Sequence, residues 1–269
     1  MTRVLVNGRE GTMIDPMDRG LQYGDGLFET LAVVDGRARF FDWHLERLAE
    51  GARRLALPMP EARLLREEIA EAWPRGRGVV KLILTRGVGA RGYRPPTDAR
   101  PTRIVSGHEW PARDSRLWSE GVRAGLCRTR LGRNAALAGI KHLNRLEQVI
   151  ARAEWEDGAM DEGLMLDDRD RLIGGTMCNV LLCLSDHWVT PVLADCGVAG
   201  VMRRAFRGWA AEQGIAVMER DIAVAELAGV SAMLLTNSLI GAWPVRELAG
   251  GALPLDPFAA RFNTWLAAQ

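Results

Sequence analysis

The positions of tight turns constrain the fold of this chain more than any other feature of its sequence. Asn7-Gly8 follows a strand-like segment at residues 3–6, and Asp35-Gly36 follows an apolar run at 31–34. Asn, Asp and Gly tolerate the positive φ angles of a two-residue hairpin turn, so both sites predict paired antiparallel strands. An amphipathic helix at 42–55 with Asp42 as its cap, a second helix at 61–73 and a strand at 79–85 are expected to follow. The first part therefore predicts a lobe of short hairpins and helices.

The second half alternates strand and helix patterns. Apolar spacing predicts helices at 142–155 and 201–211, and strands at 163–166, 180–184 and 233–236. Leu146 and Ile150 lie on the apolar stripe of the first helix, and Phe206 and Trp209 are expected to face inward from the second. Residues 94–114 hold several prolines and few periodic apolar side chains, which places a linker near 111–120. The pattern predicts an α/β chain of mixed α+β type with two domains, 1–115 and 116–269.

Composition excludes several classes of protein. The 269 residues carry a formal net charge of +1 and are 48% apolar, which is ordinary for a globular protein and does not favour nucleic-acid binding. No apolar run reaches the roughly 20 residues that span a bilayer, and the amino-terminal run is too short for a signal peptide, so we expect a cytoplasmic protein without a membrane segment. Cys183 and His187 lie four positions apart without a second ligand pair, so we expect no metal.

Lysine is rare in this chain and occurs only at Lys81 and Lys141. Arginine replaces lysine on a surface, but a guanidinium stays charged and cannot attack a carbonyl as a neutral amine. Small and apolar residues precede Lys141, a setting that lowers an amine pKa and suits Schiff-base chemistry. The alternative is a surface lysine whose stem lies over apolar residues.

A glycine motif at residues 87–92 has the spacing of a dinucleotide-binding turn. That turn needs a helix directly after it, and Pro95-Pro96 argues against one. We therefore reject dinucleotide binding. A loop that carries Arg91 and Tyr93 into a ligand pocket is expected, against the alternative of a merely flexible glycine loop.

Two further segments have the composition of anion sites. Glycines at 197–200 precede the helix that is expected to begin near Val201 and Met202, where backbone amides and the helix dipole favour an anion. Thr236-Asn237-Ser238 follows a strand and offers three small polar side chains. Each segment is also compatible with a plain turn.

Together these segments resemble the fold-type IV pyridoxal-phosphate enzymes, the class IV aminotransferase-like family, and among them the aminodeoxychorismate lyases. The resemblance covers nearly the whole chain and implies a small amino-terminal α/β lobe, a larger pseudo-barrel-like carboxy-terminal lobe and an active site between them. The segments that carry it are 18–30, His44 with Arg47, 85–93, 131–134, 140–148, 197–203 and 236–239. The segment around Lys141, Ile-Lys-His-Leu-Asn-Arg-Leu-Glu-Gln, is the most specific of these.

The resemblance implies a role for each site residue. Lys141 would hold pyridoxal 5'-phosphate and act as the catalytic base, and the hydroxyl of Thr30 would assist proton movement. Arg91 and Tyr93 would hold substrate carboxylates, and in this family such loop residues serve the partner subunit, which implies a homodimer. The cofactor-binding residues would be Lys141, Arg47, Asn179, Val201, Met202, Thr236 and Asn237.

The implied reaction converts 4-amino-4-deoxychorismate, a small molecule, into 4-aminobenzoate and pyruvate in folate biosynthesis. A transaminase acting on D- or branched-chain amino acids is the first alternative. The second is a weakly active or non-catalytic relative, because Gly174 stands where the family normally has a glutamate paired with the cofactor ring nitrogen.

Overall fold

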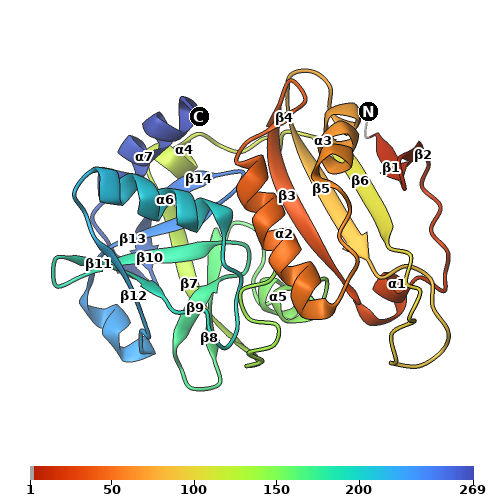
Figure 1. Ribbon diagram of the computed structural model, residues 1–269. Coiled ribbons are helices and arrows are strands. Elements are labelled where there is room, and N and C mark those ends of the chain that lie inside the picture. The colour runs from red at the N-terminus through yellow and green to blue at the C-terminus, as the bar shows by residue number, and fades with distance from the viewer. Residues whose placement is uncertain (1–2) are drawn as a thin grey trace. The chain divides into compact units, whose positions relative to one another are not determined.

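The computed structural model describes residues 3–269, and the chain divides into two compact units (Figure 1). Unit 1 runs to Ala112 and also contains Ile140–Asn144, while unit 2 consists of Arg113–Gly139 and Arg145–Gln269. This division differs from the predicted one, 1–115 and 116–269, at residues 113–115 and 140–144. Residues 140–144 belong to unit 1 because they hydrogen-bond to one of its strands. The two paired segments lie more than 100 residues apart in the sequence, so local sequence patterns do not reveal the pairing.

Unit 1 is built on a six-stranded antiparallel sheet in the order β2-β1-β6-β5-β3-β4. Both predicted hairpins are confirmed, because Asn7-Gly8 and Asp35-Gly36 adopt positive φ angles between paired strands. Strand β6 lies within residues 94–114, where the prolines and the lack of apolar periodicity led us to expect no strand. The elements are β1 Val4–Val6, β2 Arg9–Glu10, α1 Arg19–Tyr23, β3 Gly26–Val34, β4 Arg37–Ala38, α2 Phe41–Leu55, α3 Ala62–Ala72, β5 Arg77–Thr85 and β6 Thr102–Glu109.

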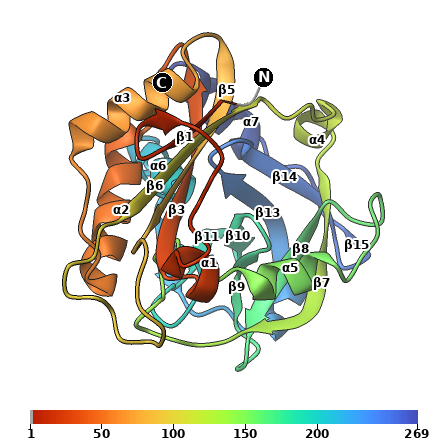
Figure 2. The same ribbon diagram turned by 90° about the vertical axis from the view of Figure 1, so that its right-hand side faces the viewer.

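Helices α2 and α3 cover one face of this sheet (Figure 2). Successive strand residues point to opposite faces. In β3, Leu27 lies against Gly51 of α2, so the odd-numbered side chains face the helices and Phe28 and Thr30 face the other way. The predicted cap at Asp42 is wrong: α2 begins after Phe40, which has a φ of 51° and makes no side-chain capping bond. Phe28 and Thr30 are thereby placed on the sheet face away from the helices.

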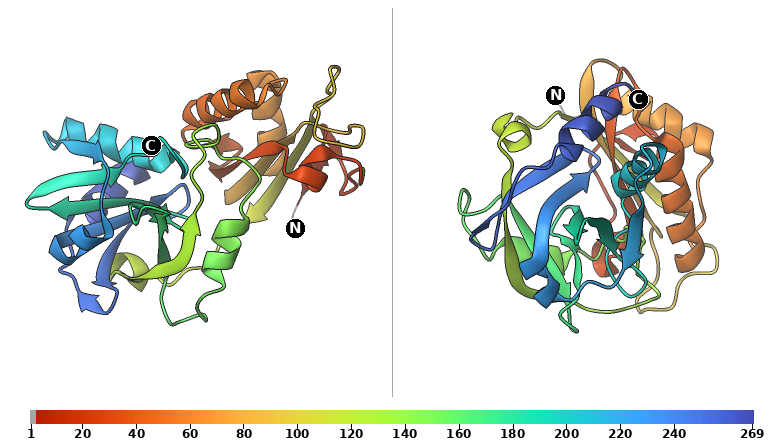
Figure 3. Two further views of the ribbon diagram at one scale, coloured as in Figure 1. Left: turned by 90° about the horizontal axis from the view of Figure 1, so that it is seen from below. Right: turned by 90° about the vertical axis from the view of Figure 1, so that its left-hand side faces the viewer.

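Unit 2 is built on a curled nine-stranded sheet that forms an open half-barrel (Figure 3). Its strand order is β12-β11-β10-β13-β14-β7-β8-β9, and β15 pairs with β14. The elements are α4 Arg116–Ser119, β7 Val122–Leu131, α5 Leu146–Arg152, β8 Glu162–Asp167, β9 Leu172–Gly175, β10 Asn179–Leu184, β11 His187–Pro191, α6 Val201–Glu212, β12 Val217–Arg220, the 3-10 helix η1 Val224–Gly229, β13 Val230–Asn237, β14 Gly241–Leu248, β15 Gly251–Ala252 and α7 Phe258–Ala267.

The core of unit 2 fills the inside of the curled sheet with branched aliphatic side chains and Trp243. Helix α6 packs through Phe206 and Trp209, which lie edge-on or tilted against Phe262 of α7 at ring-centroid distances of 5.0 and 5.5 Å. The predicted inward face of this helix is confirmed. Aromatic packing of this kind stabilises the position of α6 and hence of its first turn.

The helix predicted at 142–155 is shorter than expected. It spans only Leu146–Arg152, since residues 140–144 are extended and belong to unit 1. Leu146 is 69% exposed and Ile150 is 51% exposed, so the stripe expected to be buried is not. Apolar periodicity identifies a helix face but does not say what covers it. Among residues 3–269, no helix is long and apolar enough to cross a membrane.

Candidate active site

Lys141 lies beside the first residues of β3, along the edge of that strand that faces away from β5. The Phe28 amide donates to the Lys141 carbonyl at 2.9 Å, and the Leu143 amide donates to the Gly26 carbonyl at 3.0 Å. Leu27 and His142 form an antiparallel bridge between these bonds. Directly opposed residues of antiparallel segments point to the same face, and the Lys141 Nζ lies 4.3 Å from the centre of the Phe28 ring. The amine is therefore held on the sheet face away from the helices.

Thr30 and Lys81 share that face. They are directly opposed across β3 and β5, and the Lys81 Nζ lies 5.4 Å from the Phe28 ring centre. The two lysines of the chain thus flank one aromatic ring, with the Thr30 hydroxyl two positions along the same strand. The structure places Lys141, Thr30 and Lys81 on one face of the sheet around Phe28. The rarity of lysine singled out Lys81, but only strand register reveals its neighbours.

Arg47 lies on the opposite face of β3, where it binds Glu29. The Arg47 Nε donates to Glu29 Oε1 at 2.8 Å and its Nη2 donates to Oε2 at 2.5 Å, while His44 Nδ1 lies 2.6 Å from Oε2. Burial favours a raised pKa for Glu29, but the charge of Arg47 and the hydrogen bonds from His44 and Arg47 outweigh it and lower the pKa to about 2. Glu29 stays ionised and fixes the Arg47 guanidinium.

Residues 86–101, which we call the Arg91 loop, connect β5 to β6. All of them are described and none is helical, so the helix that a dinucleotide-binding turn requires does not follow the glycine motif. Arg91 and Tyr93 are exposed, Tyr93 by 86%. The two predicted substrate residues are therefore accessible within unit 1.

Unit 2 holds five of the predicted residues. Helix α6 begins at Val201, as expected, and Gly200 precedes it without a side-chain capping bond. The Asn179 Nδ2 donates to the Val198 carbonyl at 2.8 Å, and its Oδ1 lies so close to Gly200 that an added Cβ would be 1.9 Å away. Only glycine fits there, so the first amides of α6, including that of Met202, are next to Asn179.

Thr236 is directly opposed to Asn179 across β13 and β10. It is 1% exposed, and its Oγ1 has no hydrogen-bond partner within residues 3–269. A buried hydroxyl without a partner costs free energy unless a ligand satisfies it. Asn237 is used differently, since its Oδ1 accepts from the amides of Leu239 and Ile240 at 2.9 and 3.1 Å and closes a turn.

Gly174 lies in β9, opposite Met165 of β8. An added Cβ would lie 3.0 Å from the Cys178 carbonyl oxygen, so a side chain there requires a small backbone shift. Glu162 at the start of β8 is a buried carboxylate, and its Oε1 accepts from the amide and hydroxyl of Thr176 at 3.0 and 2.5 Å. Glu162 therefore orders the turn that leads to β10.

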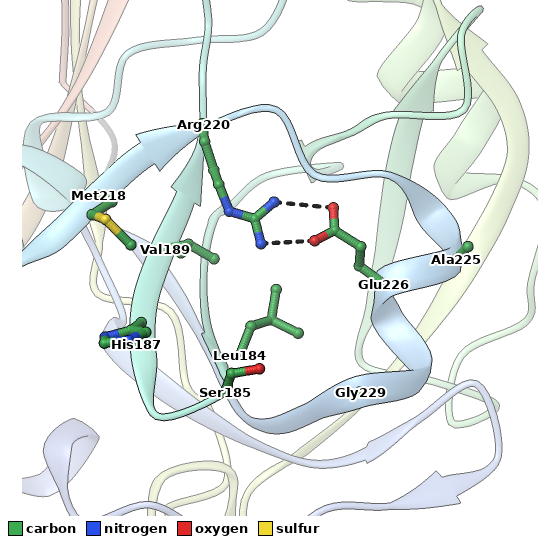
Figure 4. A pocket seen from close by; sticks show the side chains of 9 residues that line it. All are labelled: Leu184, Ser185, His187, Val189, Met218, Arg220, Ala225, Glu226 and Gly229. Atoms are coloured by element: carbon green, nitrogen blue, oxygen red, sulfur yellow. Dashed lines mark hydrogen bonds and ion pairs between the residues drawn. The ribbon is translucent and has the colours of Figure 1, made fainter.

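A separate cavity of about 510 Å³ opens between the β10–β11 turn, β12 and η1 (Figure 4). Its polar wall is the ion pair in which Arg220 donates two bonds to Glu226, at 3.0 and 2.7 Å. Glu226 also accepts from the Ala223 amide at 2.8 Å. These groups satisfy one another, and none of the predicted site residues lines the cavity, so we do not assign the active site to it.

The predicted residues fit pyridoxal phosphate in their chemistry. Unit 1 supplies a primary amine at Lys141, and unit 2 supplies a buried hydroxyl with unused hydrogen-bonding capacity at Thr236 beside the first amides of a twelve-residue helix. A phosphate is bound well by helix amides and hydroxyl groups. Within residues 3–269, no group of three or more His, Cys, Asp or Glu side chains is arranged to hold a metal ion.

Comparison with known proteins identifies the family of this chain. Residues 26–248 match the Amino-transferase class IV family. The chain is 32% identical to an aminodeoxychorismate lyase of Vibrio harveyi over 93% of both chains. It superposes on the structure of 4-amino-4-deoxychorismate lyase from Pseudomonas aeruginosa with a TM-score of 0.94 and 48% identity, covering 99% of this chain and 98% of that one. It superposes on a fold IV-transaminase from Curtobacterium pusillum with a TM-score of 0.82 and 27% identity, covering 96% of this chain and 89% of that one. The chain belongs to the amino-transferase class IV family.

Proposed function

We propose that this protein is a pyridoxal-phosphate-dependent carbon–oxygen lyase that converts 4-amino-4-deoxychorismate into 4-aminobenzoate and pyruvate. The observation that carries the proposal is the convergence of Lys141 and Thr30 on the Phe28 face of β3. The similarity to two lyases of this activity supports it, since their identities of 32% and 48% exceed the 27% found for the transaminase. A base beside a hydroxyl suits a reaction that moves protons without a keto-acid acceptor.

The cofactor would be held from both units. Lys141 and Arg47 of unit 1, with Asn179, Thr236 and Asn237 and the amides of Val201 and Met202 of unit 2, would bind it. Pyridoxal phosphate, when bound, supplies a carbonyl that takes up the substrate amine and a ring that delocalises negative charge.

Lys141 acts as the general base. As a neutral amine it takes the proton from the ring carbon that carries the substrate nitrogen. The bond from the neighbouring ring carbon to the enolpyruvyl oxygen then breaks, and the ring becomes aromatic. Lys141 or the Thr30 hydroxyl delivers a proton to the leaving enolpyruvate carbon, which gives pyruvate.

The substrate carries two carboxylates, and unit 1 offers cations for both. Arg91 and Tyr93 are exposed on their loop, and Lys81 lies on the Thr30 face of the sheet. An arginine binds a carboxylate through two parallel bonds, whereas a lysine acts as a point charge. We assign one carboxylate to Arg91 with Tyr93 and the other to Lys81.

Gly174 bears on the rate of this reaction. A carboxylate beside the cofactor ring nitrogen strengthens the electron sink, and glycine cannot provide one. A transamination depends fully on that sink, whereas formation of an aromatic ring drives the elimination. We propose that the lyase reaction tolerates Gly174, and this favours the lyase over the transaminase and over a non-catalytic relative.

We further propose a cytoplasmic homodimer. Both units expose apolar side chains: Met13, Met17 and Leu21 around α1, and Leu146 and Val149 on α5. Apolar surface of this kind is typical of contact with another chain. The four cysteines, all among the described residues, are free thiols, which suits a reducing compartment. Light scattering that gives a monomer mass would contradict the dimer.

The activity is tested directly by incubating the cofactor-loaded protein with 4-amino-4-deoxychorismate and no keto acid. We expect equal amounts of 4-aminobenzoate, measured by fluorescence, and pyruvate, measured with lactate dehydrogenase. Lys141→Arg is the matched control, because it keeps the charge but cannot lose its proton, and it should be inactive. Absence of pyruvate, or product formation only after a keto acid is added, contradicts the proposal.

A further inference from the structure

The two ends of the Arg91 loop are fixed against each other. Gly87 has a φ of 83°, and a Cβ added to it would lie 1.9 Å from the Arg100 carbonyl oxygen. Only glycine allows this contact. The first turn of the loop is also bound to the first residue of α1, because the Arg19 amide donates to the Gly87 carbonyl at 2.9 Å. These contacts fix the ends of the loop but not its tip, which carries Arg91 and Tyr93.

The side chain of Arg19 holds that tip. Its Nη1 donates to the Gly92 carbonyl at 2.8 Å and its Nη2 donates to the Tyr93 carbonyl at 3.0 Å. The guanidinium is buried, with 3% of the residue exposed. Both bonds are charge-assisted and go to backbone atoms, so they fix the course of the chain and not one rotamer of a loop side chain.

Asp25 orients Arg19 for this role. Its Oδ2 accepts from Arg19 Nε at 2.9 Å, and Arg86 donates to both of its oxygens at 2.7 and 3.0 Å. Burial favours a raised pKa for Asp25, but hydrogen bonds and charge from Arg86 and Arg19 outweigh it, so the pKa is lowered. Arg86 also donates to the carbonyls of Leu55 and Ala56 at the end of α2. The anchor of the loop is therefore built into the body of unit 1.

Tyr23 completes the anchor. Its ring lies under the Arg19 guanidinium, with the carbon of that group 4.8 Å from the ring centre. Its hydroxyl accepts from the Gly92 amide at 3.3 Å, and its ring meets the ring of Tyr93 edge-on at 5.5 Å. Gly89 passes so close that an added Cβ would be 2.8 Å from Arg19 Cδ.

We propose that Arg19 and Tyr23 are positioning residues that set the conformation of the Arg91 loop and thereby the affinity for the carboxylate substrate. The inference rests on the proposed function, in which Arg91 and Tyr93 bind a carboxylate. Neither Arg19 nor Tyr23 takes part in proton transfer. Their loss therefore changes substrate binding and leaves the chemistry at Lys141 intact.

Two variants test the anchor at different strengths. Arg19→Lys keeps a charge for Asp25 but loses the two-pronged contact with the loop carbonyls, and Tyr23→Phe loses only the hydroxyl that accepts from Gly92. We expect KM for 4-amino-4-deoxychorismate to rise about tenfold in Arg19→Lys, because small misplacements of binding groups have large effects, and less in Tyr23→Phe. The kcat and the cofactor absorbance should stay within twofold of the parent.

Limited trypsin digestion gives a readout that needs no substrate. Cleavage after Arg91 should be faster in both variants than in the parent, whereas Arg94 and Arg100 precede prolines and are not cut by trypsin. Arg63→Lys is the control, since Arg63 is exposed on α3, pairs with Glu67 at 3.1 Å and is remote from the loop in sequence. It should change neither KM nor the cleavage rate.

Each outcome decides a different claim. Unchanged KM and unchanged cleavage in Arg19→Lys overturn the inference, as does a fall in kcat or cofactor content at unchanged KM. If Arg19→Lys fails to fold, Tyr23→Phe decides the matter alone. If the parent protein releases no pyruvate, the proposed function fails, and the digestion still shows whether Arg19 and Tyr23 hold the loop.

Discussion

At the scale of single residues, Arg47 has two roles that must be separated. It is proposed to bind the cofactor phosphate, and it also neutralises the buried carboxylate of Glu29. Removal of one member of a buried ion pair destabilises a protein by about 3–5 kcal/mol, because the other charge is left uncompensated. A simple alanine substitution therefore changes folding and binding together.

A double variant separates the two roles of Arg47. Arg47→Ala should unfold at lower urea than the parent, and Glu29→Gln/Arg47→Ala should recover part of that loss since no buried charge remains unpaired. Both should bind pyridoxal phosphate at least about tenfold more weakly, because the charge-assisted bonds to phosphate are gone. Absorbance titration of the cofactor-free proteins measures this. A double variant with parental cofactor affinity would rule out the phosphate role.

Glu29 also predicts a pH dependence of stability. Its pKa is about 2 in the folded chain and 4.5 in the absence of structure, so the folded state favours the ionised form. This stabilisation is fully present above pH 4.5 and is lost as the pH falls toward about 2. Glu29→Gln cannot titrate, and its free energy of unfolding should fall less across that window than the parent's. Glu50→Gln, which removes an exposed pair, should change the profile little. Parallel profiles for Glu29→Gln and the parent contradict the assignment.

At the scale of elements, helix α6 depends on two glycines in opposite ways. Gly200 stands at the start of the helix, where a Cβ would collide with Asn179 Oδ1 at 1.9 Å, and Gly208 has nothing within 4 Å of an added Cβ. A helix with glycine in its interior is less stable than one with alanine there by about 0.5–1 kcal/mol. Because a Cβ at Gly208 meets no other atom, alanine at this position should stabilise the helix.

Alanine at these two positions should therefore have opposite effects. Gly208→Ala is expected to raise the melting temperature and leave cofactor binding unchanged. Gly200→Ala should lower the melting temperature and weaken cofactor binding, because Asn179 must move and its bond to the Val198 carbonyl breaks. Thermal unfolding and absorbance titration check both. Equal behaviour of the two variants would contradict the proposed site at the start of α6.

Elements with strong local signals could be predicted from the sequence. Asn7-Gly8 and Asp35-Gly36 form the expected hairpin turns, and α6 buries Phe206 as expected. Strand β6 was not predicted, because its pairing with β5 and β1 depends on residues distant in the chain. Apolar periodicity predicted that Ile150 is buried, yet it is exposed. The spacing of apolar residues shows which face of a helix is apolar, but it does not show whether another element packs against that face.

The site could be predicted only in part for the same reason. The rarity of lysine pointed to Lys141, and the family resemblance supplied Thr30 and Arg47. Neither reveals that Lys141 pairs along β3 or that Lys81 lies opposite Thr30. Strand register decides which side chains share a face, and register depends on the whole sheet.

At the scale of the whole molecule, the exposed Arg91 loop and the proposed homodimer lead to a complementation experiment. If the loop serves the site of the other subunit, a mixed dimer of Arg91→Ala and Lys141→Ala chains has one complete site. Mixing denatured chains in equal amounts and refolding them should restore roughly a quarter of the parental activity, the share expected from random pairing of two chains. Each variant refolded alone is the control. No recovery in the mixture would show that the loop acts within its own chain.

The measurement that tests the central claim most directly is reduction of the cofactor-loaded protein with borohydride followed by peptide mapping. The claim is that Lys141, held beside the Phe28 ring, carries pyridoxal phosphate. The chain contains only one other lysine, Lys81, which makes the result unambiguous. We expect the reduced cofactor on Lys141 and a parental level of label in Lys81→Arg. Label confined to Lys81, or absent from loaded protein, would contradict the account.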